Sequence, residues 1–97
     1  MNIPRYLTIT ELGKTIAGMS PNTTRRYLKE MEASPRYKHA ALYLNLETVR
    51  YSTLCFFDYL YYRAKLIDKN LSKFVPDYDP AQAARLLGEE YEKRGNT

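Results

Sequence analysis

Residues 21–32 concentrate side chains whose chemistry suits contact with nucleic acid bases. On a helix, one side of this segment carries an amide and three cations, Asn22, Arg25, Arg26 and Lys29. Arginine can donate two hydrogen bonds to guanine, and asparagine can pair with adenine in the same bidentate way. Thr23, near the helix start, can bond a phosphate or touch a thymine methyl group. Lys29 suits the phosphate backbone better than a base.

The opposite side of the same helix is apolar. Thr24, Leu28 and Met31 cluster there, with Tyr27 at the edge. A recognition helix needs this division, because one side docks on the protein while the other enters a DNA groove. An ordinary solvated helix face has a similar charge pattern, but the turn, the caps and the polarity together favour DNA binding.

Start and stop signals predict a second helix just before this one. Thr8 and Glu11 form a capping box, and an apolar stripe follows at helical spacing, made of Ile9, Leu12 and Ile16. Gly18 predicts the end of this helix near Ala17, and Ser20 followed by proline begins the next one. A short interhelical turn with glycine is typical of a helix-turn-helix, although any αα-hairpin can contain one.

A second basic segment follows the break at Ser34 and Pro35. It contains Arg36, Tyr37 and Lys38, which we predict to contact DNA as part of a wing. In a winged arrangement such a segment approaches the sugar–phosphate backbone or the minor groove, where inserted arginine is favoured. An ordinary polar loop explains the same residues equally well.

The remainder of the chain predicts a short strand and two further helices. The strand covers residues 41–44, and we expect a long third helix from a cap at Asn45 to about Asp68. The alternative is a hairpin through Val49–Tyr51 followed by a helix capped by Ser52; we prefer the long helix because its periodicity is unbroken. A linker over 69–78 and a last helix over about 80–92 complete the chain.

The third helix has a second apolar side, made of Tyr51, Cys55, Tyr59, Tyr62 and Leu66. A helix that is apolar on two sides is buried centrally or pairs with another chain. We expect central burial, and a homodimer through the third or the C-terminal helix is the alternative.

Composition excludes several classes of protein. The formal net charge is +4, and the basic excess lies in the first three quarters of the chain, as expected for a partner that carries phosphates. Cys55 is the only cysteine, so no internal disulfide forms and a cytoplasmic protein is expected. We expect no membrane span, metal or cofactor, and no catalytic activity, because no nucleophile–base pair, phosphate loop or metal spacing is present.

Residues 6–12, 18–20 and 23–27 together resemble the excisionase-like, MerR-type winged helix-turn-helix proteins of phages and conjugative transposons. Residues 42–46, followed by an aromatic helix, are similar to the end of small excisionases. The resemblance implies a DNA-binding accessory factor that steers an integrase or recombinase toward excision, or a transcriptional regulator. It places the recognition helix at 21–32 and the wing at about 36–44. Family wings often bear glycine, and no glycine lies between Gly18 and Gly88.

We therefore predict a mainly α fold: a helix-turn-helix with a short β wing, a long third helix and a C-terminal helix. Residues 1–70 would form the DNA-binding domain, and 71–97 a linker and helix that pack on it or on a partner. The expected function is sequence-specific binding of double-stranded DNA. The alternative is a protein–protein interaction module, such as a phage-encoded inhibitor, that uses the tyrosine-rich helical surface.

Overall fold

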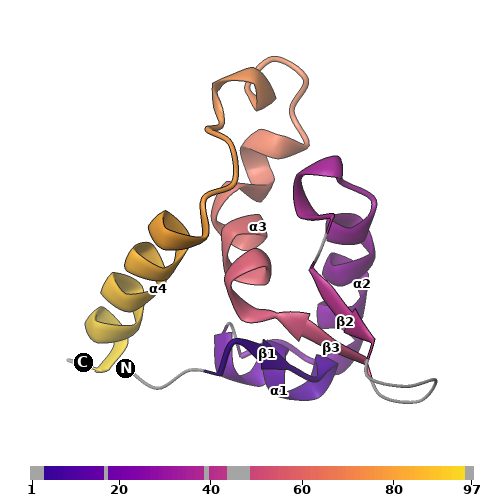
Figure 1. The fold of residues 1–97 in the computed structure, drawn as a ribbon, viewed down its shortest axis with the longest axis vertical. Coiled ribbons are helices and arrows are strands. Elements are labelled where there is room, and N and C mark those ends of the chain that lie inside the picture. Colours follow the sequence, from indigo (N-terminus) through magenta and orange to yellow (C-terminus); the bar gives the residue numbers. More distant parts are fainter. Residues whose placement is uncertain (1–3, 17, 39, 44–48, 96–97) are drawn as a thin grey trace.

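The computed structural model of the chain describes residues 4–16, 18–38, 40–43 and 49–95. It is mainly helical, with a small antiparallel sheet (Figure 1). Helix α3 runs through the centre, with α2 along one side and α4 along the other, and α1 and the sheet lie across one end (Figure 1). The elements in chain order are β1 (Tyr6–Leu7), α1 (Ile9–Ile16), α2 (Pro21–Glu32), the 3-10 turn η1 (Pro35–Tyr37), β2 (Ala41–Tyr43), β3 (Val49–Ser52), α3 (Thr53–Leu66), the 3-10 turn η2 (Ser72–Phe74) and α4 (Pro80–Gly95).

Strand β3 is the centre of the sheet and pairs antiparallel with both neighbours, in the order β1-β3-β2. Tyr51 stands opposite Leu7 of β1 and opposite Ala41 of β2. Strands β2 and β3 therefore form a hairpin whose connecting residues, 44–48, lie outside the described residues. The strand predicted over 41–44 is observed at 41–43, and residue 44 lies outside the described residues.

Both predicted helix starts are confirmed in detail. The Thr8 hydroxyl accepts a hydrogen bond from the Glu11 amide at 3.4 Å, and the Glu11 carboxylate accepts one from the Thr8 amide at 3.3 Å. Ser20 caps α2, with Pro21 at its first turn. Gly18 has φ +62°, the left-handed conformation in which glycine is favoured at helix ends. The predicted end of the first helix, Ala17, lies outside the described residues.

The core forms where the first three helices meet beside the sheet. Leu12 and Ile16 of α1, Leu28 and Met31 of α2, and Phe56 of α3 are all buried. Helices α1 and α2 approach very closely: a Cβ on Gly13 would lie 2.0 Å from Thr24 Oγ1, a distance that no real contact allows. Helices α1 and α2 can therefore pack this closely only because residue 13 has no side chain.

The third helix begins later than we predicted. Our preferred helix from Asn45 is wrong, because Val49 lies in β3 and α3 begins at Thr53 with Ser52 as its cap. The alternative hairpin is the observed arrangement, and the predicted cap Asn45 lies outside the described residues. The reason is long-range: the sheet pairs β3 with two other strands, and the Thr53 hydroxyl donates a hydrogen bond to the Pro4 carbonyl at 2.6 Å.

Helix α4 packs against α3 and buries Ala83 and Leu87. Asp79 precedes it and accepts a hydrogen bond from the Ala81 amide at 3.0 Å, as a residue that caps a helix start does. On the second apolar side of α3, Cys55 and Tyr59 are buried, in keeping with the expected central burial. None of the helices in the described part of the chain combines the length and the apolar character that crossing a membrane requires.

Candidate nucleic-acid interface

Helix α2 presents its polar and apolar residues on separate sides, as predicted. Thr24, Leu28 and Met31 are buried. The amide and the three cations of the predicted contact surface are all exposed, and Thr23 is half-buried beside them. We call the set Asn22, Thr23, Arg25, Arg26 and Lys29 the basic face.

Hydrogen bonds fix the start of the basic face. The Ser20 hydroxyl accepts from the Thr23 amide at 3.3 Å and donates to the Thr23 hydroxyl oxygen at 3.1 Å. One turn further, Arg25 Nη1 donates to Asn22 Oδ1 at 3.3 Å. These hydrogen bonds lie at the helix N-terminus, where the helix dipole and the first amides favour an anion. The arrangement can therefore hold an anion beside an amide and guanidinium groups, which are able to form bidentate hydrogen bonds.

Glu30, an acid of α2, forms its hydrogen bonds with α3 and not with the basic face. Glu30 Oε1 accepts hydrogen bonds from Arg63 Nε at 2.8 Å and from the Tyr59 hydroxyl at 2.7 Å. The Arg63 guanidinium, followed by the Tyr59 hydroxyl, lowers the pKa of Glu30. In turn, burial and the hydrogen bond to Glu30 raise the pKa of Tyr59 to about 12. The charge of this carboxylate is therefore neutralised on α3 and opposes the basic face less.

Two guanidinium groups lie near the ring of Tyr27 at the boundary of the basic face. The Arg63 guanidinium carbon is 4.6 Å from the ring centroid, and that of Arg26 is 5.1 Å away. Cation–π contacts of this kind steady an arginine without neutralising its charge. Sequence reasoning missed Arg63 as a positioning residue; its spacing of four from Tyr59 places both on one side of α3, which is the only local signal for it.

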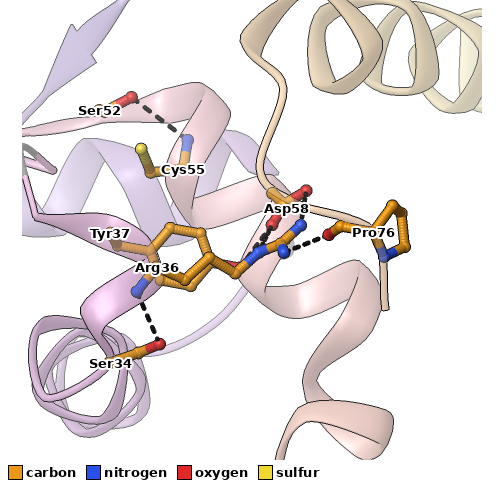
Figure 2. A network of polar contacts seen from close by, with 7 residues as sticks. All are labelled: Ser34, Arg36, Tyr37, Ser52, Cys55, Asp58 and Pro76. Carbon is orange, nitrogen blue, oxygen red and sulfur yellow. Dashed lines mark hydrogen bonds and ion pairs between the residues drawn. The ribbon is translucent and has the colours of Figure 1, made fainter. Parts of the chain in front are cut away.

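The second predicted basic segment is placed differently from the prediction. Tyr37 is 3% exposed, so its predicted contact with DNA is wrong in this arrangement. Arg36 extends from η1 to α3, where its Nε lies 2.9 Å from Asp58 Oδ2 and its Nη2 lies 3.3 Å from Asp58 Oδ1 (Figure 2). Its Nη1 donates to the carbonyl of Pro76, and the Tyr37 hydroxyl donates to the same carboxylate.

The physical reason is the buried charge of Asp58, a residue that is 5% exposed. A carboxylate removed from water requires a cation and hydrogen-bond donors, which η1 supplies. Burial, together with the adjacent carboxylate, raises the pKa of Tyr37 well above its ordinary range. Arg36 thus links η1, α3 and the segment before α4 instead of facing outward, and its predicted role as a wing cation is corrected.

Lys38 is the exposed member of the predicted wing residues, and its neighbour His39 lies outside the described residues. Strand β2 lies within the segment we predicted as the wing, and its partner β3 lies beyond that segment. Among the described residues of that hairpin, Arg50 is the only cation, and it is half-buried. The hairpin alternative contained this residue, but its sequence context did not single it out.

No group of three or more acidic, histidine or cysteine side chains that could hold a metal occurs within the described ranges. Comparison of the chain with family models, with curated proteins and with solved structures finds no match. The assignment of a function therefore depends on the geometry of the chain itself.

Proposed function

We propose that the chain binds double-stranded DNA, with α1 and α2 acting as a helix-turn-helix and α2 as the recognition helix. The observation that supports this most strongly is the division of α2 into a buried side and a basic face. A helix fits the major groove of B-DNA, and its outward side chains then meet base edges. Arg25 and Arg26 are the proposed base readers, and Asn22 the proposed reader of adenine. Thr23 and Lys29 would bind phosphates.

The capped N-terminus of α2 adds to this proposal. Recognition helices of the helix-turn-helix class direct their first residues at the bases. Here Ser20, Asn22 and Thr23 occupy that end, and Gly18 gives the short turn that precedes it. In this proposal the wing is the hairpin of β2 and β3, which includes residues 41–43 of the predicted wing, and Arg50 is its proposed backbone contact. Lys38 remains a proposed phosphate contact, whereas Arg36 and Tyr37 are withdrawn from the interface.

The resemblance of the sequence to excisionase-like proteins suggests two biological roles for a DNA-binding chain of this kind. We infer a small accessory factor of a mobile element, either an excisionase that acts with an integrase or a transcriptional regulator. Both roles use the same contact surface. A gel shift on attachment-site DNA and on promoter DNA of the same element would separate them.

The decisive test selects bound duplexes from a random pool and then measures their affinity for two double variants. Replacing Arg25 and Arg26 together by alanine should cost about 1–3 kcal/mol for each arginine that reads a base. Affinity should also fall steeply with salt, because phosphate contacts release counterions. The matched control replaces Lys65 and Arg85 by alanine, which removes the same charge from exposed positions outside α2.

Equal affinities of the two double variants would reject α2 as the recognition helix while leaving nonspecific electrostatic binding intact. Failure of the parent chain to bind any duplex at moderate salt would reject DNA binding altogether. These outcomes are distinguishable, because the first retains a salt-dependent shift and the second does not.

A second candidate function has its own observation. Beyond the core, Tyr61 is 52% exposed, Ile67 61% and Phe74 72%, around the end of α3 and η2. Exposed apolar clusters mark surfaces for protein partners. If the chain acts as an interaction module, replacing Ile67 and Phe74 by serine should abolish its complex with the partner protein in sedimentation experiments. Replacing Arg25 and Arg26 by alanine should leave that complex intact.

A further inference from the structure

A cavity of about 500 Å³ opens where four parts of the chain meet. Its lining comes from β1, from η1, from the start of α3 and from the segment that enters α4. No lining residue belongs to α2, so the cavity is separate from the basic face and shares only Lys38 with the proposed phosphate contacts. Pockets that hold small organic molecules have volumes of about 300–1,000 Å³, and this cavity lies within that range.

The charge of the lining is one-sided. It contains three cations, Arg5, Arg36 and Lys38, and no carboxylate. Arg36 is already paired with Asp58 (Figure 2). Arg5 and Lys38 are exposed, and neither forms an ion pair with another described residue. An anion in the cavity would therefore meet two cations that are not paired with any acid in the described part of the chain.

Away from these cations, the lining is mostly apolar. Leu54, Pro35 and the rings of Tyr6 and Tyr78 supply flat or branched surface. Burial, and then the neighbouring Cys55 thiol, raises the pKa of Tyr78 well above its ordinary range, so its hydroxyl keeps its proton and can donate. A ligand that matches this lining has an apolar body and an acidic group at one end.

We propose that this cavity binds a small organic anion, a molecule with a flat aromatic body and a single carboxylate or sulfonate. The body would lie against Leu54 and the tyrosine rings, and the anionic group would lie between Arg5 and Lys38. The cavity is bounded by η1 and by the segment that enters α4, so a bound molecule would bridge both. The basic face takes no part in this binding, which can be tested without DNA.

Two fluorescent probes of the same shape test the proposal. 8-Anilinonaphthalene-1-sulfonate carries the anion, and N-phenyl-1-naphthylamine is its uncharged counterpart. We expect saturable binding of the sulfonate at one site, with about tenfold higher affinity than the neutral probe, because two rim cations favour it. Replacing Arg5 and Lys38 by glutamine should remove that difference and leave the neutral probe unaffected.

The matched control replaces Lys65 and Lys69 by glutamine, which removes two exposed charges outside the lining. This control should bind both probes as the parent does. The change Leu54→Trp should fill the cavity and abolish binding of both probes, with circular dichroism showing whether the variant is folded. The proposal is overturned if the sulfonate binds no more tightly than the neutral probe, or if the Arg5 and Lys38 variant binds it as the control does.

Discussion

Arg63 Nε of α3 lies 2.8 Å from Glu30 Oε1 of α2, and the two side chains are each about one third exposed. The same carboxylate oxygen accepts the hydrogen bond of the Tyr59 hydroxyl. This contact joins α2 to α3 and pairs the Glu30 carboxylate with a cation of α3. Solvent screens the ion pair, so it adds little to the stability of the fold. The larger contribution comes from the buried Tyr59 hydroxyl, which needs the Glu30 carboxylate as its acceptor.

Replacing Glu30 separates these two contributions. Glu30→Ala leaves the Tyr59 hydroxyl without its acceptor, and Tyr59 is 3% exposed. An unsatisfied buried donor costs about 1–3 kcal/mol, so the free energy of unfolding in urea should fall by that amount. Glu30→Gln keeps an acceptor oxygen in place and should cost less. Equal losses for the two variants would show that the charge, and not the hydroxyl, carries the stability.

The same contact predicts how stability depends on pH. Arg63 and Tyr59 lower the pKa of Glu30 from its ordinary value of 4.5, so the folded chain favours the ionised carboxylate. The stabilisation is therefore complete above about pH 4.5 and is lost as the pH falls through the lowered value. Urea titrations of the parent and of Glu30→Gln should differ most near neutral pH and converge in acid.

Arg63→Gln is the control for this pH effect, because it removes the cation that lowers the pKa and leaves the carboxylate. As the pH falls, the unfolding free energy of this variant should decrease less than that of the parent. If the parent and both variants decline in parallel from pH 7 to pH 3, the Glu30 contact does not contribute to the pH dependence.

Replacing Arg36, which pairs with Asp58, should lower the stability of the fold and leave the affinity for DNA unchanged. Arg36→Met leaves a carboxylate that is 6% exposed in its side chain without its cation. Breaking a buried pair in this way costs about 3–5 kcal/mol, measured as the free energy of unfolding. Adding Asp58→Asn in the same chain should recover part of that loss, because the buried charge is then gone.

DNA affinity distinguishes this arrangement from the wing that the sequence predicted. The folded fraction of Arg36→Met should bind duplex as tightly as the parent, since Arg36 lies against α3. A variant of unchanged stability and reduced DNA affinity would return Arg36 to the interface.

Local signals were sufficient for α1 and α2 because their determinants lie within a few residues. These determinants are short-range patterns: the capping box at Thr8, the serine and proline at the start of α2, and the helical periodicity that buries Leu28. The basic face was predicted by the same periodicity. Its exposure follows directly from the burial of the opposite side, so no knowledge of distant residues was necessary.

The segments predicted wrongly depend on partners that are distant in the chain. Arg36 and Asp58 are separated by 22 positions, and no residue near Arg36 in the sequence indicates that it pairs with a buried carboxylate. Likewise, Val49 fits a helical stripe and a strand equally well by periodicity. Its state is decided by pairing with Tyr43, to which it stands opposite in the sheet. Sheet pairing and buried ion pairs are therefore the parts of this fold that local patterns could not supply.

The close contact of α1 with α2 predicts a large effect from a single methyl group. Gly13→Ala would place its Cβ 2.0 Å from Thr24 Oγ1 and 3.1 Å from the Met19 carbonyl oxygen. Thr24 is fully buried, and its hydroxyl donates to the Ser20 carbonyl at 2.9 Å, so it cannot turn aside without losing that bond. The helices must separate, and overpacking of this kind costs about 1–3 kcal/mol of unfolding free energy.

A double-mutant cycle identifies the contact responsible. In a Thr24→Ala chain the obstructing oxygen is absent, so Gly13→Ala should cost clearly less there than in the parent. Thr10→Ala is the control, because that position of α1 is exposed and should lose little stability. Additive costs in the cycle would mean that Thr24 is not the obstacle. Because α2 carries the basic face, the same displacement should also weaken duplex binding in gel shifts of the folded Gly13→Ala protein.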